Sequence, residues 1–485
     1  MSISSLEPRK VFQFFEEILN IPRPSKKEEK IVQYLIDFAR ERSLEYKVDK
    51  VGNVVIKKPA SLGMEKHKTV VLQAHVDMVT EKDTSVKHDF ERDPIQAYID
   101  GEWIKARGTT LGADDGIGVA TILAILDSKD IKHPPIEGLF TVDEETGLTG
   151  AFALEPDFFD GKILINLDSE DWGEIFIGSA GGMDTQAEFD YIPQKLSGGI
   201  AYKIIIDDLH GGHSGDEIDK GYANAIKLLD RFLIKLLYEM PYYLAHFHGG
   251  KLRNAIPRDA YAIIVFEPKY ENILKQVYQK YQNIFKDEFG KIEPNLRFEI
   301  EKTSMPDYAI KDEVAIKLLW SLYGCPHGVY AWSKDIPGLV ETSTNLATVR
   351  TQENKITVGT SQRSSKESAK DDIATMVKSV FILAGAEVSH TDGYPGWTPN
   401  LDSEILNITV KTYKQLFGHE PRVRAIHAGL ECGLFLDKYP YLDMISIGPT
   451  IKGAHTPEEK LHIPSTQEFW TLILEVLKHI PEEKT

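Results

Sequence analysis

Hydrophobic side chains recur at helical spacing over the first part of the chain. Between residues 8 and 45 they fall three or four positions apart, which predicts two amphipathic helices. Pro22 and Pro24 lie between the two periodic stretches and separate them, because proline interrupts a helix. Short strands are expected next, at residues 46–48 and 54–57.

A different pattern follows at residues 70–79. Here an unbroken apolar run leads into His75 and Asp77. Such a run fits a strand buried on both faces, as in a parallel sheet. The two-residue period of a strand points both polar side chains the same way. Since ligands bind beyond the carboxyl ends of strands in open α/β sheets, the sequence predicts a site at this edge.

Strand and helix patterns then alternate in both terminal parts of the chain. This alternation predicts an α/β fold, with a mostly parallel sheet flanked by helices. The expected strands are 101–106, 138–142, 163–167 and 444–447. One helix is expected to begin near Ile117, and two others are expected at 405–417 and 467–477.

The middle of the chain has another character, starting near residues 179–183. It contains two similar passages, each expected to form a small β-α-β unit. The first comprises strand 202–206, the loop HGGHSG, helix 223–237 and strand 260–266, and the second comprises strand 355–359, the loop QRSSKES and helix 371–383. We therefore expect an inserted α+β domain at 184–390, which splits a catalytic domain into 1–183 and 391–485.

The overall charge narrows the class of partner. The 485 residues include 56 Lys and Arg against 74 Asp and Glu, a net charge of −18. This balance argues against nucleic acid or an anionic membrane as a partner. The acidic charge is compatible with small cationic or zwitterionic substrates, but solubility alone is the simpler explanation. The chain has only two cysteines, no apolar signal core at its N-terminus and no run of membrane-spanning length. These features predict a soluble, cytoplasmic protein.

Side chains that bind metals occur at five separate places near expected strand ends or loops. Each has an ordinary explanation alone, as a hydrogen-bonded core histidine, a helix cap or a solvated turn. Together, crowded carboxylates would repel one another unless cations neutralised them. Imidazole with carboxylate suits zinc, cobalt or manganese, and the set is large enough for two ions that share one carboxylate. The residues are His75, Asp114 with Asp115, Glu144 with Glu145, Asp168, and His455.

The chain resembles a known family at these places. It closely resembles the aminoacyl-histidine dipeptidases in the sequences AHVDMV, GTTLGADDGIG, TVDEETGLTGA, NLDSED and IGPTIKGAHTPEEKLHI. These dipeptidases are cytosolic di-zinc enzymes of the wider aminoacylase/carboxypeptidase metallopeptidase family. The resemblance covers essentially the whole chain. It implies two divalent ions, most simply zinc, with cobalt and manganese as alternatives.

The resemblance also implies a role for each ligand. His75 and Asp168 would hold one ion, and Glu145 and His455 the other. Asp114 would bridge the two ions, and its peptide bond to Asp115 would be cis. Asp77 would orient the His75 ring as a carboxylate behind the ligand. Glu144 would be the general base.

Residues of the inserted domain, called the lid in this family, would contact the substrate. His213 would stabilise the oxyanion, although a turn histidine is the alternative. Asn254 and Arg363 would grip the substrate backbone and its terminal carboxylate, although Arg363 could also be a surface charge. Asn345 and Glu431 are further candidates, Glu431 either for the substrate amine or as a helix cap.

The implied reaction is the hydrolysis of dipeptides with a free N-terminus, notably Xaa-His substrates such as β-alanyl-histidine, by a water between the ions that Glu144 activates. Alternatives within the family are a tripeptidase, a broader dipeptidase or an N-acyl amino acid hydrolase. An inactive metal- or peptide-binding protein is the alternative of another class. Some relatives dimerise through the lid and others have a doubled lid, and we expect a homodimer.

Overall fold

The computed structural model describes residues 2–391 and 393–483, and the chain forms two compact units. Unit 1 comprises the chain up to Ser179, Trp397–Ala425 and the chain from Leu430 onward. Unit 2 comprises Ala180–Gly396 and Ile426–Gly429. The sequence placed the insertion at 184–390, and it gave no sign that four residues near position 427 belong with unit 2.

Unit 1 is built on an eight-stranded sheet of order β1-β2-β6-β3-β7-β21-β8-β20. A separate four-stranded sheet has the order β22-β23-β5-β4. The strands are β1 (Glu45–Val48), β2 (Val54–Lys58), β3 (Val70–His75), β4 (Ala97–Asp100), β5 (Trp103–Ala106), β6 (Ile136–Thr141), β7 (Ile163–Asn166), β8 (Glu174–Ser179), β20 (Arg422–Ile426), β21 (Asp443–Ser446), β22 (Ile451–Lys452) and β23 (Lys460–His462). The helices are η1 (Ile3–Ser5), α1 (Arg9–Leu19), α2 (Glu29–Glu41), α3 (Ala113–Asp127), α4 (Glu144–Gly147), α5 (Thr149–Ala153), α10 (Glu404–Phe417), α11 (Glu431–Lys438) and α12 (Ile463–Lys478).

The centre of the large sheet is parallel, and its outer strands are antiparallel. Strand β3 pairs in parallel with β6 and β7, and β7 pairs in parallel with β21. All six residues of β3 are buried, as expected for a strand covered on both faces. Leu139 of β6 packs with residues of α5 and α11, while a Cβ at the neighbouring Gly138 would touch Ile122 and Leu126 of α3. Helices therefore cover both faces, and the predicted α/β class is confirmed.

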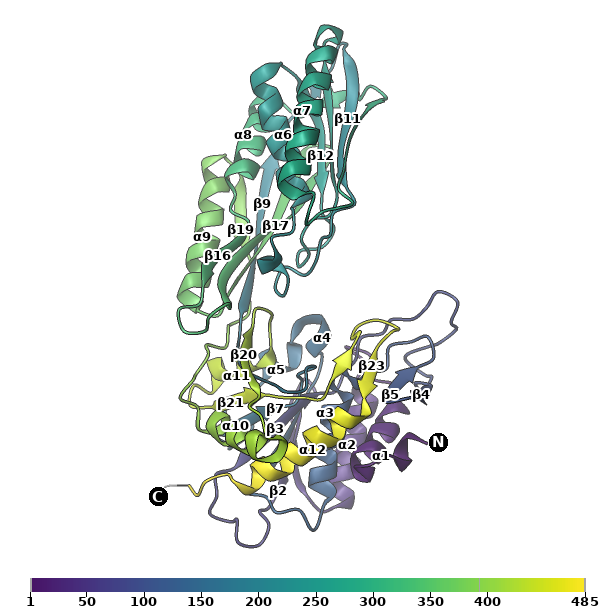
Figure 1. Ribbon diagram of the computed structural model, residues 1–485, viewed down its shortest axis with the longest axis vertical. Coiled ribbons are helices and arrows are strands. Elements are labelled where there is room, and N and C mark those ends of the chain that lie inside the picture. Colours follow the sequence, from purple (N-terminus) through teal and green to yellow (C-terminus); the bar gives the residue numbers. More distant parts are fainter. Residues whose placement is uncertain (1, 392, 484–485) are drawn as a thin grey trace. The chain divides into compact units, whose positions relative to one another are not determined.

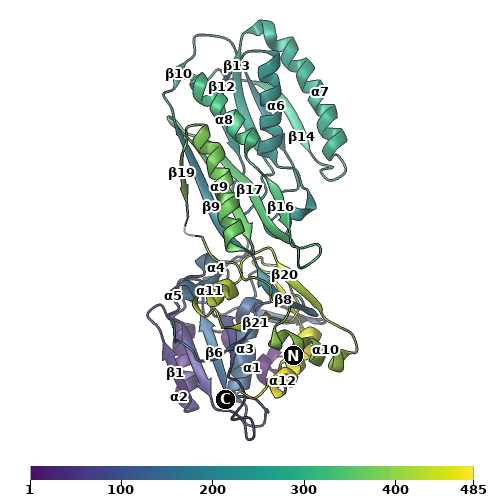
Figure 2. The same cartoon turned by 90° about the vertical axis from the view of Figure 1, so that its left-hand side faces the viewer.

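Unit 2 is a nine-stranded antiparallel sheet with helices α6 to α9 on one face (Figure 1, Figure 2). Its strands are β9 (Gly181–Asp190), β11 (Ile200–Asp207), β12 (Tyr243–Gly249), β13 (Ala260–Phe266), β14 (Arg297–Thr303), β16 (Gly328–Trp332), β17 (Val340–Thr351), β18 (Lys355–Ser364) and β19 (Glu387–His390), with β10 (Gln194–Lys195) and β15 (Tyr308–Ala309) paired apart. Its helices are η2 (Ile218–Lys220), α6 (Ala225–Glu239), η3 (Pro268–Tyr270), α7 (Glu271–Phe289), α8 (Asp312–Gly324) and α9 (Glu367–Leu383).

Several local predictions were wrong. The first middle passage is not a β-α-β unit, because β12 lies between α6 and β13, and β11 and β13 pair antiparallel. In the second passage β18 runs on through Ser364, so the start of QRSSKES is strand rather than loop. Two other local predictions were close. Asp114 and Asp115 at the start of α3 have non-helical backbone angles, so the regular helix begins near the predicted Ile117. The strand expected at 101–106 is β5, and only its hairpin partner β4 was missed.

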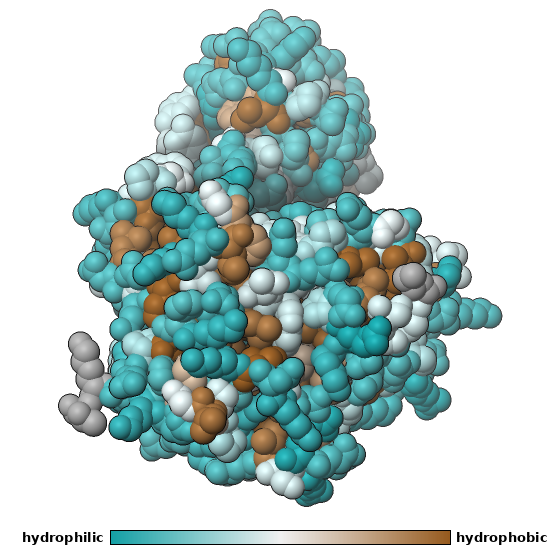
Figure 3. Space-filling view, turned by 60° about the horizontal axis from the view of Figure 1, so that its bottom comes forward, coloured by the Kyte–Doolittle hydropathy of each residue, from teal (hydrophilic) through white to brown (hydrophobic). Residues whose placement is uncertain are grey.

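The surface in Figure 3 is mainly hydrophilic, with hydrophobic residues in small separate groups. No helix in the described ranges combines the length and the apolar character needed to cross a membrane.

Candidate metal centre

The carboxyl ends of the parallel strands carry the predicted ligands of unit 1. His75 is the last residue of β3, Asp168 follows β7, and Glu144 opens α4 just beyond β6. Asp114 lies at the start of α3, and His455 lies in the turn between β22 and β23. Neighbouring parallel strands end at the same edge, so residues distant in sequence meet there.

The structure brings all five predicted ligands together around Asp114. His75 Nε2 lies 3.0 Å from Asp114 Oδ1 and 3.4 Å from Asp168 Oδ1. His455 Nε2 lies 3.1 Å from Asp114 Oδ2 and 3.0 Å from Glu145 Oε2. The two oxygens of Asp114 thus face two different imidazoles, each of which has a second carboxylate beside it.

Asp77 holds this arrangement from behind. Its carboxylate lies 3.3 Å from His75 Nδ1 and accepts a hydrogen bond from Ser25 Oγ at 2.8 Å. It also accepts hydrogen bonds from the backbone N–H groups of Glu144 and Glu145, at 3.0 and 3.2 Å. One buried carboxylate therefore fixes both the His75 ring and the turn that presents the two glutamates.

The charges of the centre depend strongly on one another. Hydrogen bonds to Asp114 and Glu145 raise the pKa of His455 to about 11. Burial opposes charge on His75, but Asp168 and Asp114 outweigh it and raise the pKa of that imidazole well above its usual range. Burial, together with the charge of Asp114, raises the pKa of Asp168 to about 8. This crowd of acids is stable only with positive charge among them.

Divalent cations fit this set of donors. His75, Asp114 and Glu145 each offer a ligand atom within 4.8 Å of the others. Glu145 Oε1 is buried without a hydrogen-bond partner in the described structure. Two imidazoles and three carboxylates are the ligands of zinc, cobalt and manganese rather than of copper(I).

Glu144 is half-buried and lies among other acids. Burial raises the pKa of its carboxyl well above the usual range, and the negative charges of Asp168 and Glu145 add to this. A nearby divalent cation would act in the opposite direction and favour the ionised form.

Two roles were predicted for the Asp114–Asp115 pair, metal ligand and helix cap, and each suits one of the two residues. Asp114 faces the imidazoles, whereas Asp115 Oδ1 accepts a hydrogen bond from the backbone N–H of Gly118 at 3.1 Å, as a helix cap does. The peptide bond between them is cis, as the resemblance implied.

Glu431 lies wholly buried at the start of α11 and does not cap that helix. Its Oε2 accepts hydrogen bonds from Gln73 Nε2 at 2.7 Å and from Thr141 Oγ1 at 2.9 Å, while Oε1 has no partner in the described structure. Burial raises the pKa of this carboxyl to about 7.

Three other predicted residues lie together in unit 2. His213 forms an isolated β-bridge with Ala255, next to Asn254. The Asn254 side chain is exposed, and the buried Asn345 donates hydrogen bonds to the carbonyls on either side of it, those of Arg253 and Ala255. Asn345 therefore holds the turn that presents Asn254.

Arg363 lies on β18, and its reading as a surface charge is wrong. The residue is 7% exposed, its Nη1 donates to Tyr394 Oη at 2.9 Å, and its Nε has no partner in the described structure. Burial works against ionisation of Asp216, but His213 and Arg363 outweigh it and lower the pKa of that carboxyl. His213, Asp216 and Arg363 thus belong to one polar cluster of unit 2.

Two further residues support the centre, although the sequence analysis did not single them out. Arg23 and Glu459 are buried and bind the backbone around Asp114. The only sequence signals were the position of Arg23 between Pro22 and Pro24 and that of Glu459 shortly after His455.

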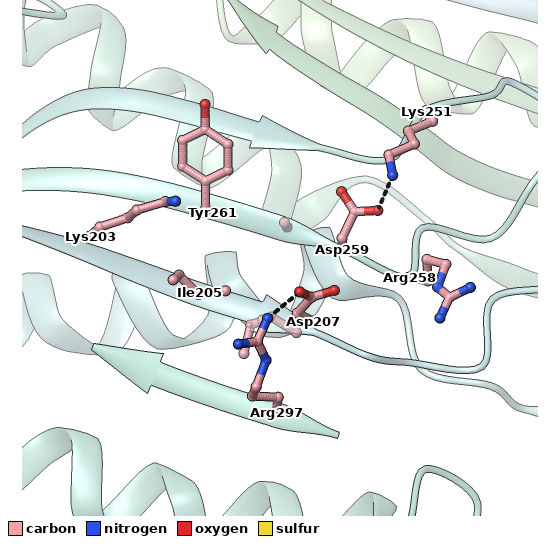
Figure 4. A pocket seen from close by; sticks show the side chains of 10 residues that line it. Lys203, Ile205, Asp207, Lys251, Arg258, Asp259, Tyr261 and Arg297 are labelled. Carbon is pink, nitrogen blue, oxygen red and sulfur yellow. Dashed lines mark hydrogen bonds and ion pairs between the residues drawn. The ribbon is translucent and has the colours of Figure 1, made fainter. Parts of the chain in front are cut away.

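A separate hollow of about 440 Å³ lies on unit 2 (Figure 4). Two of its basic side chains are paired, Arg297 with Asp207 and Lys251 with Asp259. None of the predicted substrate residues lines it, and it is not part of the site.

Comparison with known proteins identifies relatives over the whole chain. The model of peptidase family M20/M25/M40 matches residues 71–479. The cytosol non-specific dipeptidase of Escherichia coli is 43% identical over 480 residues, which cover 99% of each chain. The crystal structure of aminoacylhistidine dipeptidase from Vibrio alginolyticus superposes with a TM-score of 0.92 at 45% identity, covering 100% of this chain and 99% of that one.

A more distant structure shares the fold alone. A tripeptidase from Staphylococcus aureus has a TM-score of 0.57 at 16% identity, covering 98% of this chain and 99% of that chain.

Proposed function

This chain belongs to peptidase family M20/M25/M40, and from that premise we propose that it is a cytoplasmic di-zinc dipeptidase, with Xaa-His dipeptides among its substrates. The observation that carries the proposal is the position of Asp114 between two imidazole–carboxylate pairs. The names of the Escherichia coli and Vibrio alginolyticus relatives support dipeptides as the substrate class. A reducing compartment is supported by the two buried free cysteines and by the word cytosol in the name of the Escherichia coli relative.

In this proposal His75 and Asp168 would hold one ion, Glu145 and His455 would hold the other, and Asp114 would reach both. Zinc ions bound there would polarise the substrate carbonyl and make the attacking water more acidic. Glu144 takes a proton from the attacking water and later gives it to the leaving amine. Asp77 keeps the His75 ring and the Glu144 turn in place throughout.

Three residues of unit 2, and Glu431 of unit 1, bind the substrate in this proposal. Arg363 binds the terminal carboxylate, since a guanidinium with an unpartnered Nε can form charge-assisted hydrogen bonds. Asn254 binds the peptide backbone, and His213 stabilises the oxyanion. Glu431, whose Oε1 has no partner in the described structure, binds the free amine of the substrate.

A substrate panel tests the proposal. Zinc-loaded protein is incubated with Xaa-His and Xaa-Gly dipeptides, a tripeptide and an N-acetylated amino acid, and products are quantified. Dipeptides with a free amine should be cleaved fastest. Faster cleavage of the tripeptide or the N-acetyl compound would indicate a tripeptidase or an acyl hydrolase, and no cleavage at all would indicate a binding protein.

We further propose a homodimer formed through unit 2. Ile316, Trp320 and Tyr323 follow one side of α8 and are 45%, 45% and 49% exposed. Tyr238 of α6 extends this apolar surface, with its ring 6.3 Å from that of Trp320. Exposed apolar groups of this kind favour association. Sedimentation should give a dimer for the natural chain and a monomer for Trp320→Lys, and equal masses would refute the interface.

A further inference from the structure

The structure points to Glu459 as a positioning residue of the metal centre, which fixes the turn that presents Asp114 and ties it to the segment that carries His455. This inference rests on the proposed function, in which both of those residues bind metal. Glu459 does not reach the ligands' side chains in any hydrogen bond, so it would act through the backbone.

The carboxylate of Glu459 is buried and binds four successive backbone N–H groups. Its Oε2 accepts from Leu111 at 2.7 Å and from Gly112 at 2.9 Å. Its Oε1 accepts from Ala113 at 2.8 Å and from Asp114 at 3.2 Å. The residue is 2% exposed, so these bonds are shielded from competing water. Any displacement of the carboxylate would displace the backbone of Asp114.

Glu459 belongs to the same hairpin as His455. Its backbone N–H donates to the carbonyl of Thr456, the residue after His455, at 3.1 Å. Strand β23 begins with the next residue and pairs with β5, which anchors the hairpin in the small sheet. The His455 ring itself is half-exposed. Glu459 is therefore the buried link between two ligand-bearing segments.

Arg23 grips the same turn from the other side. Its Nη2 donates to the carbonyl of Gly112, and its Nη1 donates to the carbonyls of Val76 and Asp77, which follow His75. A Cβ at Gly112 or at Gly116 would lie 2.7 or 2.6 Å from Arg23 Nη2. Both glycines leave room for the guanidinium, so the turn is shaped around this contact.

A simple helix cap is the ordinary explanation for Glu459, since acids favour helix N-termini. A cap usually comes from the residue next to the helix and satisfies one or two N–H groups. Glu459 instead comes from a segment 345 residues away and binds four. Metal ligands must be held to within about half an ångström of their working positions. The hydrogen bonds of Glu459 would hold the Asp114 turn in this way.

The test compares Glu459→Gln with Glu137→Gln. Glu137 is a matched control, because it is also buried and also accepts backbone N–H groups, from Asp160 and Gly161, but sits at the start of β6, away from the site. Zinc affinity is measured by competition with a chromophoric chelator, and the unfolding temperature is measured on metal-free protein. Glu459→Gln should lose about 10- to 100-fold in zinc affinity and a similar factor in kcat, with KM little changed. Glu137→Gln should keep the affinity of the natural chain.

Glu459→Asp provides a second variant, since it keeps both oxygens at a shorter reach and should recover part of the zinc affinity. Zinc affinity within twofold of the natural chain in Glu459→Gln would overturn the inference. So would the failure of both Glu459 variants to fold, because Glu459 would then be needed for the fold itself. The affinity measurement needs no substrate, so an inactive natural chain would count against the proposed function and not against this inference.

Discussion

At the scale of single residues, the same side-chain type has different roles because its surroundings differ. Asp114 faces two imidazoles, Asp77 binds one imidazole and two backbone N–H groups, and Asp115 binds a backbone N–H within its own helix. Glu144 and Glu145 are adjacent, yet only Glu145 lies beside His455. Glu144 is therefore left for proton transfer, which is the basis of the catalytic assignment.

Replacing Glu144 by glutamine should lower kcat by about 100- to 10,000-fold, because the general base is lost. Zinc content, measured by atomic absorption, should stay at two ions per chain, since Glu144 is not among the proposed ligands. Retention of near-full activity with two bound ions would show that Glu144 is not the base.

Glu431 should make stability depend on pH. Its pKa is about 7 in the folded chain against an ordinary value of 4.5, so the unfolded chain releases this proton at lower pH. The folded state is therefore penalised as pH rises from about 4.5 to about 7, by about 3 kcal/mol in all. Below that window both states are protonated, and the penalty is absent.

Glutamine at position 431 removes this penalty. In urea unfolding with a chelator present, the difference in unfolding free energy between Glu431→Gln and the natural chain should grow from pH 5 to pH 7 and then level off. A difference that does not vary with pH would contradict the assignment.

At the scale of elements, the sequence predicted an element best where the element's own pattern of apolar residues determined its burial. The buried run of β3 predicted a strand covered on both faces, and that prediction is confirmed. The pattern failed for β18, because QRSS is polar although these residues are buried between β17 and β9, where polar side chains bond to one another. Arg23 and Glu459 could not be found, since their role is set by which backbone groups the fold brings to them.

Strand β18 gives Arg363 a fixed, buried position, which makes it a sensitive test of substrate binding. Arg363→Lys should raise KM about 10- to 100-fold for dipeptides, because a charge-assisted hydrogen bond to carboxylate contributes about 1.5–3 kcal/mol. Dipeptide amides, which lack the carboxylate, should show the same KM with both proteins. Tyr394→Phe serves as a control for loss of the Arg363–Tyr394 hydrogen bond. An equal rise in KM for acids and amides would exclude carboxylate binding.

At the scale of the whole molecule, the cations should stabilise the folded chain, because ligands from segments far apart in sequence bind them only after folding. At a free zinc concentration of about 100 times Kd, each site should contribute about 2.7 kcal/mol. Chelation should lower the unfolding temperature, and added zinc should restore it.

The variant His455→Ala refines this prediction. His455 is half-exposed, so its removal should leave the fold intact while weakening one of the two sites. Zinc should then stabilise this variant less than the natural chain. An unfolding temperature that changes with neither chelator nor zinc would contradict metal binding at this centre.

The most direct test of the whole account is anomalous diffraction from crystals of the zinc-loaded protein, collected on both sides of the zinc absorption edge. We expect two peaks about 3.5–4 Å apart, one beside His75 and Asp168 and the other beside His455 and Glu145, with Asp114 reaching both. A single peak, or zinc held by other residues, would contradict the account.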